Sequence, residues 1–300
     1  RVLFRSHLPD DYRSRVPPKY FDDWELVNSG HNYQPDIYEF SQALIDVFNV
    51  PMVVDIGSGN GTKLATLVHD KKIGVDFGEN LERSKENYPW ITWVNMNLES
   101  PDYDALEALV PSGSLIICAD VVEHLINPVP LVSVWRRLVE GGRLLISSTP
   151  DRNLCRGLDD RGPPGNPSHV REWTLSEYTS FLNHERVPLT CVGHTRDRDV
   201  DWSLSTIASF HGLVGGTICE ITPSPPVFSD LRFWTRAIRQ HNVMPQGAVD
   251  IAANLAQVEL EHLSEILTVR DNQVAELEQL LAESAASASA FADERAADAA

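Results

Sequence analysis

Short runs of apolar, β-branched residues alternate along the chain with amphipathic segments. Such runs predict parallel strands that are buried on both faces, and apolar residues at helical spacing predict helices that cover a sheet. The strand-type runs lie at residues 52–56, 72–77, 91–94, 114–119, 143–150, 189–192 and 205–210. The helix-type segments lie at 34–48, 62–70, 129–140, 174–186 and 231–241. This alternation predicts an α/β protein.

The first strand runs directly into a glycine-rich loop with glycines at positions 57, 59 and 61. Glycine allows positive φ and lets a ligand approach the backbone closely, while the N–H groups of a following helix can point at that ligand. A dinucleotide fingerprint has the spacing Gly-x-Gly-x-x-Gly, whereas this loop has Gly-x-Gly-x-Gly. Taken alone, the loop fits a tight turn, a dinucleotide site or an S-adenosylmethionine site.

Polar residues follow three further strands where each of them ends. Asp76 ends the second strand, Asn97 follows the third, and Asp120 begins the run Asp-Val-Val-Glu-His after the fourth. The carboxyl ends of parallel strands meet at one edge of a sheet, so these side chains should lie together. A carboxylate at the position of Asp76 can accept hydrogen bonds from both hydroxyls of a ribose. Its alternative role is that of a helix cap.

The loop, preceded by Asp55, resembles motif I of the class I S-adenosylmethionine-dependent methyltransferases. The order of motifs from this loop to Pro150 is similar to the ubiquinone-biosynthesis type of small-molecule O-methyltransferase. The resemblance implies a Rossmann-like, mostly parallel seven-stranded sheet with helices on both faces and an antiparallel pair at one edge. It also implies an S-adenosylmethionine site formed by Asp55, Gly57, Ser58, Gly59, Asp76, Asn97 and Asp120. The family usually has Asp at the position of Asn97, whose amide oxygen can accept the same bond from adenine.

Asp120, Glu123, His124 and His169 are the candidates for the chemistry of the site. In one interpretation, His124 or His169 is a general base beside Asp120, because an imidazole of near-neutral pKa suits that task. In the other, all four residues hold a divalent cation such as Mg²⁺ or Mn²⁺ that lowers the pKa of the acceptor. This run also resembles the metal-dependent small-RNA 2′-O-methyltransferases, which usually have Glu at the position of Asp120. A purely structural role, with the same side chains capping a helix and fastening a loop, is the third alternative.

The remaining segments suggest a division into four parts. We expect a cap segment over 1–34, the S-adenosylmethionine-binding domain over 35–212, a linker with a short helix over 213–248, and a coiled coil with an Ala-rich acidic tail over 249–300. Leucines three and four apart between 260 and 281 predict the coiled coil, and with it a homo-oligomer. The cap segment, rich in aromatic residues and proline, could cover a substrate pocket.

Composition narrows the possible partners. The net charge is −18, and no basic stripe is present, which argues against a nucleic-acid substrate. No run of eighteen apolar residues occurs, so we expect no membrane span. The four cysteines form no Cys-x-x-Cys pair, which argues against zinc and disulfides and favours the cytoplasm. The chain starts at Arg1 without a leader pattern, so we expect a piece of a longer protein.

Together these features predict an S-adenosylmethionine-dependent O-methyltransferase that acts on a hydroxyl of a small molecule or glycan. Two other functions stay open at this point. One is a catalytically silent, methyltransferase-like docking domain carried on a coiled coil. The other, an NAD-dependent dehydrogenase, is disfavoured by the spacing of the glycines.

Overall fold

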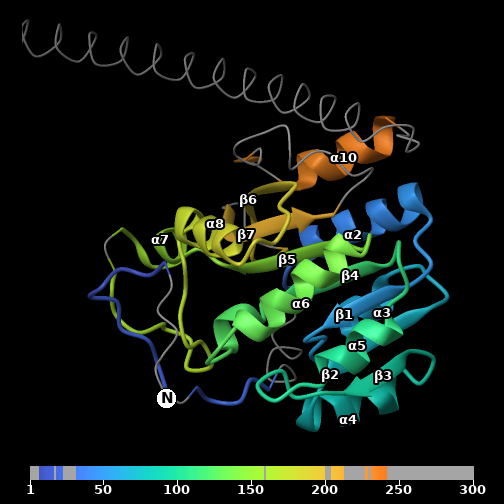
Figure 1. Cartoon of the computed structure of the whole chain (residues 1–300), viewed down its shortest axis with the longest axis horizontal. Coiled ribbons are helices and arrows are strands. Elements are labelled where there is room, and N and C mark those ends of the chain that lie inside the picture. Colours follow the sequence, from blue (N-terminus) through green and yellow to red (C-terminus); the bar gives the residue numbers. More distant parts are fainter. Residues whose placement is uncertain are drawn as a thin grey trace, which may run out of the picture. The chain divides into compact units, whose positions relative to one another are not determined.

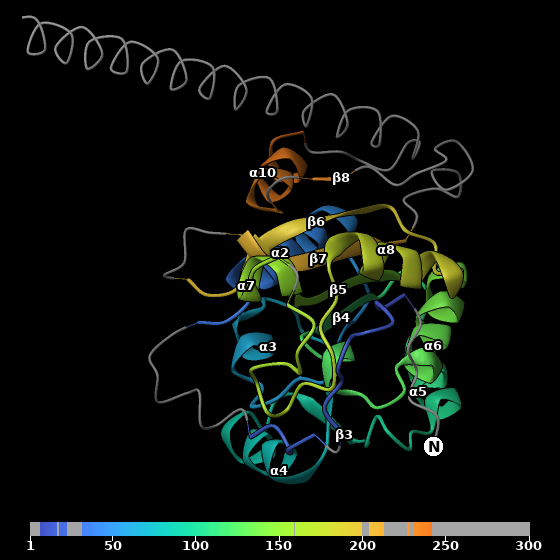
Figure 2. The same cartoon turned by 90° about the vertical axis from the view of Figure 1, so that its left-hand side faces the viewer.

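The fold is built on one twisted sheet with helices on both faces (Figures 1 and 2). The computed structural model describes residues 7–16, 18–22, 32–158, 160–199, 204–212, 227–228 and 231–241. In order across the sheet, the strands are β3 (Thr92–Asn95), β2 (Lys72–Asp76), β1 (Val53–Ile56), β4 (Leu115–Ala119), β5 (Leu144–Pro150), β7 (Leu204–His211), β6 (Cys191–Arg196) and β8 (Val227–Phe228). β3 to β5 run parallel, whereas β7 is antiparallel to both β5 and β6.

The mostly parallel, Rossmann-like sheet of seven strands is therefore confirmed, including its antiparallel edge. The two-residue strand β8 extends it by pairing in parallel with β6, which the sequence pattern did not indicate. The strand order reverses direction between β1 and β4. In open α/β sheets the crevice at this point, outside the carboxyl ends of the strands, is where ligands bind.

Each central strand is buried on both sides because its residues alternate between two apolar cores. Val53 faces the core formed with α2 (Pro35–Phe48), α3 (Thr62–Thr66) and α10 (Leu231–His241). Its neighbour Val54 faces the core formed with α5 (Tyr103–Leu109), α6 (Val129–Glu140) and α8 (Leu175–His184). This two-sided burial explains why the strand sequences are continuous apolar runs rather than alternating ones.

Helix ends follow recognisable local signals. α2 begins at Pro35, whose fixed φ suits the first turn, and α8 begins with a capping box between Thr174 and Glu177. α10 forms at the residues expected for it and packs on α2, where Arg239 and Glu39 form an ion pair of 3.2 Å. The helix predicted over 62–70 ends at Thr66, because the backbone becomes extended at Leu67.

Three helices were not predicted, and one of them is the seven-residue α5 (Tyr103–Leu109). α4 (Gly78–Asn87) is strongly charged and buries only Asn80, Leu81 and Ser84, so it has little apolar periodicity. α7 (Arg152–Arg156) is a five-residue helix between the strand expected at 143–150 and the helix expected at 174–186. Short helices of this kind depend on tertiary contacts more than on their own sequence.

The N-terminal segment lies along the loop that follows α7 (Figure 2). We call residues 7–16 and 18–22 the strap. Its backbone N–H groups at Arg13, Arg15 and Lys19 donate to carbonyls of residues 161, 170 and 167, at 2.8, 2.8 and 3.0 Å. The strap is thereby held against the loop over a long stretch.

Within the described ranges, no helix combines the length and the apolar character that a membrane crossing requires. The predicted coiled coil at 260–281 and the acidic segment after it lie outside the described residues. The predicted homo-oligomer therefore stays a prediction.

Candidate active site

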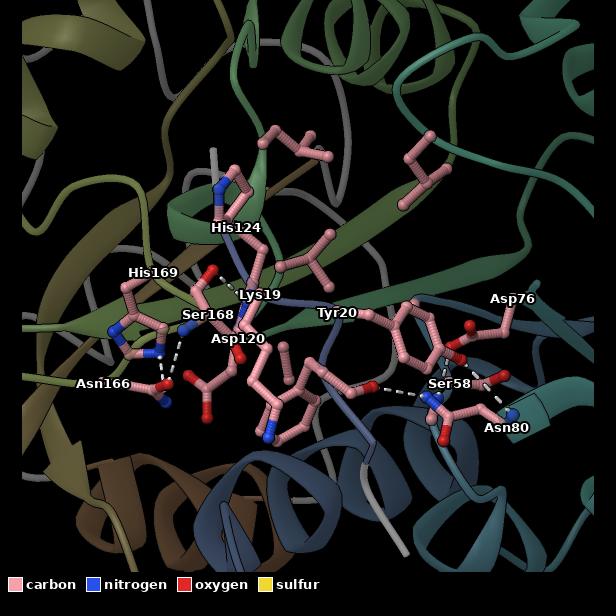
Figure 3. A pocket seen from close by; sticks show the side chains of 18 of the residues that line it. Lys19, Tyr20, Ser58, Asp76, Asn80, Asp120, His124, Asn166, Ser168 and His169 are labelled. Carbon is pink, nitrogen blue, oxygen red and sulfur yellow. Dashed lines mark hydrogen bonds between the residues drawn. The ribbon is translucent and has the colours of Figure 1, made fainter. Parts of the chain in front are cut away.

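A cavity of about 760 Å³ opens at the carboxyl ends of β1, β2 and β4, where the strand order reverses. The glycine loop and the strap both contribute to its wall. Figure 3 shows Ser58, Asp76, Asn80 and Tyr20 gathered at one end, and His124, Asn166, Ser168 and His169 at the other. Asp120 and Lys19 lie between these two groups (Figure 3). A single cavity thus joins the two sets of residues that the sequence singled out.

The glycine loop requires glycine for its shape. Gly57 and Gly61 have φ of +75° and +74°, which L-residues with a side chain rarely adopt. A Cβ on Gly57 would lie 2.4 Å from a methyl group of Val121, and one on Gly61 would lie 2.4 Å from the ring of Trp93. The loop therefore packs tightly against its own surroundings while it lines the cavity.

Asp76 sits at the end of β2 and lines the cavity beside this loop. Its Oδ2 accepts a hydrogen bond of 2.7 Å from the backbone N–H of Gly59, and its Oδ1 accepts one of 2.7 Å from Phe77. The carboxylate is fixed in place by these bonds. An ionised carboxylate offers about four acceptor sites in total, which makes it a suitable group to accept bonds from ribose hydroxyls.

Most of the predicted cofactor residues line the cavity, and one does not. Those that do are Gly57, Ser58, Gly59, Asp76, Asn97 and Asp120. Asp55 lies beneath the loop instead, where it is 1% exposed and accepts a hydrogen bond of 2.8 Å from the hydroxyl of Tyr38. In the structure, Asp55 therefore contacts helix α2 rather than the cavity.

The strap supplies cavity residues that the sequence did not identify individually. The Tyr20 hydroxyl donates to the carbonyl of Phe77 at 3.1 Å and accepts from the N–H of Asn80 at 3.4 Å. The Asn80 side chain in turn donates to the carbonyl of Phe21 at 3.0 Å. The ring centroids of Phe21 and His124 are 5.1 Å apart. The only sequence signal was the general one, a segment rich in aromatic residues ahead of the first helix.

Asp120 lies in the middle of the cavity with a left-handed backbone, φ +54°. Non-glycine residues in this region cost free energy and are typical of functional sites. Its carboxylate accepts a hydrogen bond of 3.2 Å from the Ser148 hydroxyl. Shielding from bulk water raises the pKa of Asp120, although the charge of Lys63 opposes this.

Glu123, His124 and His169 form a cluster in which one donor atom from each residue lies within 4.8 Å of the other two. Of the four residues predicted to hold a cation, Asp120 is not in this group. Glu123 is fully buried, and its Oε2 accepts a hydrogen bond of 3.1 Å from Thr149. Its Oε1 has no hydrogen-bond partner among the residues that the structure describes. Burial, reinforced by Asp120, raises the pKa of Glu123 well above its usual value.

His124 follows Glu123 on a short 3-10 turn, Val122–His124. Its Nδ1 lies 3.1 Å from the carbonyl oxygen of Ser168. A carbonyl only accepts, so Nδ1 carries the proton and Nε2 keeps its lone pair. Burial, together with the neighbouring His169, lowers the pKa of His124 to about 3. His124 is therefore neutral near pH 7 and a weak base, which argues against it as the general base.

His169 comes from the loop and packs edge-on against His124, with the ring centroids 4.7 Å apart. Its Nδ1 lies 2.8 Å from Oε1 of Glu172, and its Nε2 lies 3.0 Å from the amide nitrogen of Asn166. Burial alone would raise the pKa of Glu172, but its bonds with His169 and Arg156 lower it, so this carboxylate is ionised. The sequence showed the spacing of His169 and Glu172 but not this contact.

Comparison with known proteins gives two groups of relatives. Over 129 residues, the chain is 33% identical to two Mycobacterium tuberculosis proteins named as probable S-adenosylmethionine-dependent methyltransferases. Over 177 residues, it is 24% identical to the ubiquinone biosynthesis O-methyltransferase of Coxiella burnetii, covering 53% of this chain and 76% of that protein. Its sequence relatives are S-adenosylmethionine-dependent methyltransferases. This agrees with the resemblance seen in the glycine loop and the motifs that follow it.

The similarity is partial. The match with the Mycobacterium tuberculosis proteins covers 42% of this chain and 44% of theirs, so the chain spans less than half the length of those relatives. No family model matches the chain. Among solved structures, an S-adenosylmethionine-dependent methyltransferase from Clostridium acetobutylicum aligns with a TM-score of 0.46 and 13% identity, over 64% of this chain and 96% of that one.

Proposed function

We propose that the chain is an S-adenosylmethionine-dependent O-methyltransferase that acts on a hydroxylated small molecule or glycan. The observation that carries the proposal is the single cavity with the glycine loop and Asp76 at one end and the histidine pair at the other (Figure 3). Such a cavity can bring a bound methyl donor and an acceptor oxygen into line. The ubiquinone biosynthesis O-methyltransferases among the relatives support oxygen as the methyl acceptor.

The end of the cavity at the glycine loop would hold the cofactor. The backbone at Gly57 and Gly59 allows close approach, and the Asp76 carboxylate can accept bonds from the ribose hydroxyls. Asn97 would face the adenine. Its amide oxygen already accepts a bond of 2.9 Å from the N–H of Glu99, and an amide oxygen can accept two.

The opposite end must help an acceptor oxygen to lose its proton. An aliphatic hydroxyl with a pKa near that of water, ~15.7, lies about nine units above neutral pH, which is worth on the order of 12 kcal/mol for full deprotonation. A phenol, with a pKa of ~10, needs about a third of that. Either acceptor calls for a base or a cation beside the oxygen.

The residues present fit a divalent cation. Glu123 offers a buried carboxylate oxygen that no described residue bonds, and His124 keeps a lone pair on Nε2. The Nε2 lone pair of His169 accepts from the Asn166 amide at 3.0 Å, so a cation would have to displace that amide. One carboxylate and two imidazoles suit a first-row ion such as Mn²⁺ better than Mg²⁺, which prefers oxygen ligands. When bound, such an ion would lower the pKa of the acceptor. Asp120, which is not part of this cation site, would accept a proton or orient the cofactor. If no cation is used, His169 would be the general base.

The cavity also limits the acceptor. Its volume of about 760 Å³ must hold both the cofactor and the part of the acceptor that reacts. Apolar side chains, among them Phe21, Val121 and Leu125, surround the polar groups. A compact ring that bears a hydroxyl fits these walls.

Calorimetry with S-adenosylhomocysteine tests the proposal most directly. The wild-type chain should bind, and Asp76→Asn should bind at least tenfold more weakly, about 1.4 kcal/mol, because the ribose loses a charged acceptor. Asp104→Asn, which changes an exposed carboxylate on α5, is the matched control and should bind as the wild type does. Absence of binding heat in the wild type would refute the proposal. Binding without turnover over a broad panel of hydroxyl compounds would favour a silent docking domain.

Removal of metal separates the two chemistries. If a cation is used, treatment with EDTA should abolish methyl transfer and added Mn²⁺ should restore it. Glu123→Gln should then reduce turnover at a given Mn²⁺ concentration by roughly 10–100-fold, whereas Glu107→Gln, which only loses a surface ion pair with Arg137, should not. Unchanged turnover in EDTA would exclude the cation and leave His169 as the base.

A further inference from the structure

His169 is held at both ring nitrogens by side chains outside the predicted set. Oε1 of Glu172 lies 2.8 Å from Nδ1, and the amide nitrogen of Asn166 lies 3.0 Å from Nε2. The other oxygen of Glu172 faces Nη1 of Arg156 at 2.9 Å. These contacts connect His169 through Glu172 to Arg156, which does not line the cavity.

The contacts define where the imidazole carries its proton. The carboxylate of Glu172 can only accept, so Nδ1 must donate. The Asn166 amide is oriented independently, because its Oδ1 accepts a bond of 2.9 Å from the backbone N–H of Ser168. Its NH₂ group therefore faces Nε2, which must accept. Both contacts lead to the same tautomer, with the proton on Nδ1 and a lone pair on Nε2.

We propose that Glu172 is a positioning residue: backed by Arg156, it fixes the tautomer of His169 and so keeps a lone pair on Nε2, where an acceptor proton or a cation would take the place of the Asn166 amide. The role of that lone pair rests on the proposed function, in which Nε2 receives a proton or binds a cation. The tautomer itself does not depend on it. Outer partners of this kind orient a histidine and typically affect activity or metal affinity ~10–100-fold.

A merely structural role for the same contacts predicts different behaviour. Arg156 also pairs with Asp160 and donates to the carbonyl of Gly162, and the N–H of Glu172 donates to the Tyr12 hydroxyl of the strap at 2.9 Å. If the network only fastens the loop, then removal of any one of its contacts should lower the free energy of unfolding. The tautomer of His169 would not change.

The isosteric substitution Glu172→Gln distinguishes these roles. Arg156 offers only donors, so the Gln oxygen must turn toward it, and the Gln NH₂ group must then face Nδ1 of His169. Nδ1 becomes the acceptor and the ring proton moves to Nε2, so the Asn166 NH₂ group has to turn away from Nε2. The shape of the side chain is unchanged. Asp160→Asn is the matched control, because it weakens the same Arg156 network without touching His169.

Long-range ¹H–¹⁵N correlation spectra of the full chain, with ¹⁵N-labelled histidine, read the tautomer directly. The ten histidines require His169→Gln to assign the signal. We expect the Nδ1–H form in the wild type and in Asp160→Asn, and the Nε2–H form in Glu172→Gln. Asn166→Ala should keep Nδ1–H, because the carboxylate rather than the amide sets the tautomer. This second variant keeps the test valid if Glu172→Gln does not fold.

Activity gives the second readout. In Glu172→Gln, kcat should fall by roughly 10–100-fold while the affinity for S-adenosylhomocysteine stays within about twofold, because the change lies at the opposite end of the cavity. An Nε2–H tautomer in the wild type, an unchanged tautomer in Glu172→Gln, or a change in Asn166→Ala would each overturn the inference. Failure of the wild type and of every variant to transfer methyl groups would refute the proposed function. The tautomer of His169 is measured independently of activity, so its test would remain valid.

Discussion

Substitution of Gly57 by Ala should be strongly destabilising, and its cost can be divided into two parts. Ala at φ +75° costs about 1–2 kcal/mol for backbone strain alone. The new Cβ would also lie 2.4 Å from Cγ2 of Val121, far inside contact distance. Rotation of Val121 offers little relief, because a β-branched side chain is stiff at χ1 and its other methyl is only 3.4 Å from the same position. Overpacking of this kind costs about 1–3 kcal/mol.

Gly113→Ala is the matched control. Gly113 also has a positive φ, +82°, but a Cβ there would meet only the ring of Pro51, at the ordinary contact distance of 3.5 Å. It should show the strain without the clash. Urea unfolding should therefore give a loss of about 1–2 kcal/mol for Gly113→Ala and about 2–5 kcal/mol for Gly57→Ala.

The double variant Gly57→Ala/Val121→Ala isolates the clash. Removal of the two methyl groups of Val121 should make the cost of Gly57→Ala fall to that of Gly113→Ala when it is measured in the Val121→Ala background. Equal costs for the two glycines in the wild-type background would refute the reasoning. So would a cost at Gly57 that Val121→Ala leaves unchanged.

Two further outcomes follow from the strap and from a buried histidine. Tyr20→Phe should weaken S-adenosylhomocysteine binding about two- to fivefold in calorimetry, because the half-exposed hydroxyl forms hydrogen bonds with Phe77 and Asn80 that contribute about 1 kcal/mol or less. Tyr88→Phe, which lies outside the cavity, should leave binding unchanged. An equal loss of affinity in both variants would contradict this prediction. Burial lowers the pKa of His211 to about 4 although its bond to a carbonyl opposes this, so below pH ~6.5 the unfolded chain binds a proton that the folded chain does not. The free energy of unfolding in urea should be measured at pH 7.5 and at pH 5 for both proteins. Between these pH values it should fall by about 2 kcal/mol less in His211→Gln than in the wild type. An identical fall in both proteins would contradict the lowered pKa of His211.

The sequence was most informative where burial is two-sided. Val53 to Ile56 and Leu115 to Ala119 could be recognised as strands because both of their faces lie in apolar cores, so that Asp55 is the single charged residue in the two runs. The residues at the ends of these strands could then be placed at one edge of the sheet. α7 could not be found in this way, because a five-residue helix capped by Asp151 has no room for an apolar period.

The candidate site was predictable only as far as chain order and strand ends determine it. Asp76 and Asp120 line the cavity because Asp76 is the last residue of β2 and Asp120 directly follows β4. Asp55 occupies a strand position as well, but its side chain points to α2 and bonds Tyr38, a choice of face that one residue of register decides. The contact of Glu172 with His169 depends on the path of an irregular loop, for which the sequence has no periodic signal.

The strap connects the two ends of the cavity, and this has a consequence for how variants should be interpreted. Tyr20 bonds residues beside Asp76, Phe21 packs on His124, and Tyr12 accepts the N–H of Glu172 behind His169. One segment therefore contacts the end assigned to the cofactor, the histidine cluster and the network that orients His169. Displacement of the strap would reach all three regions, whereas Asp76→Asn and Glu172→Gln each act at one end. Only the latter pair can separate binding of the methyl donor from activation of the acceptor.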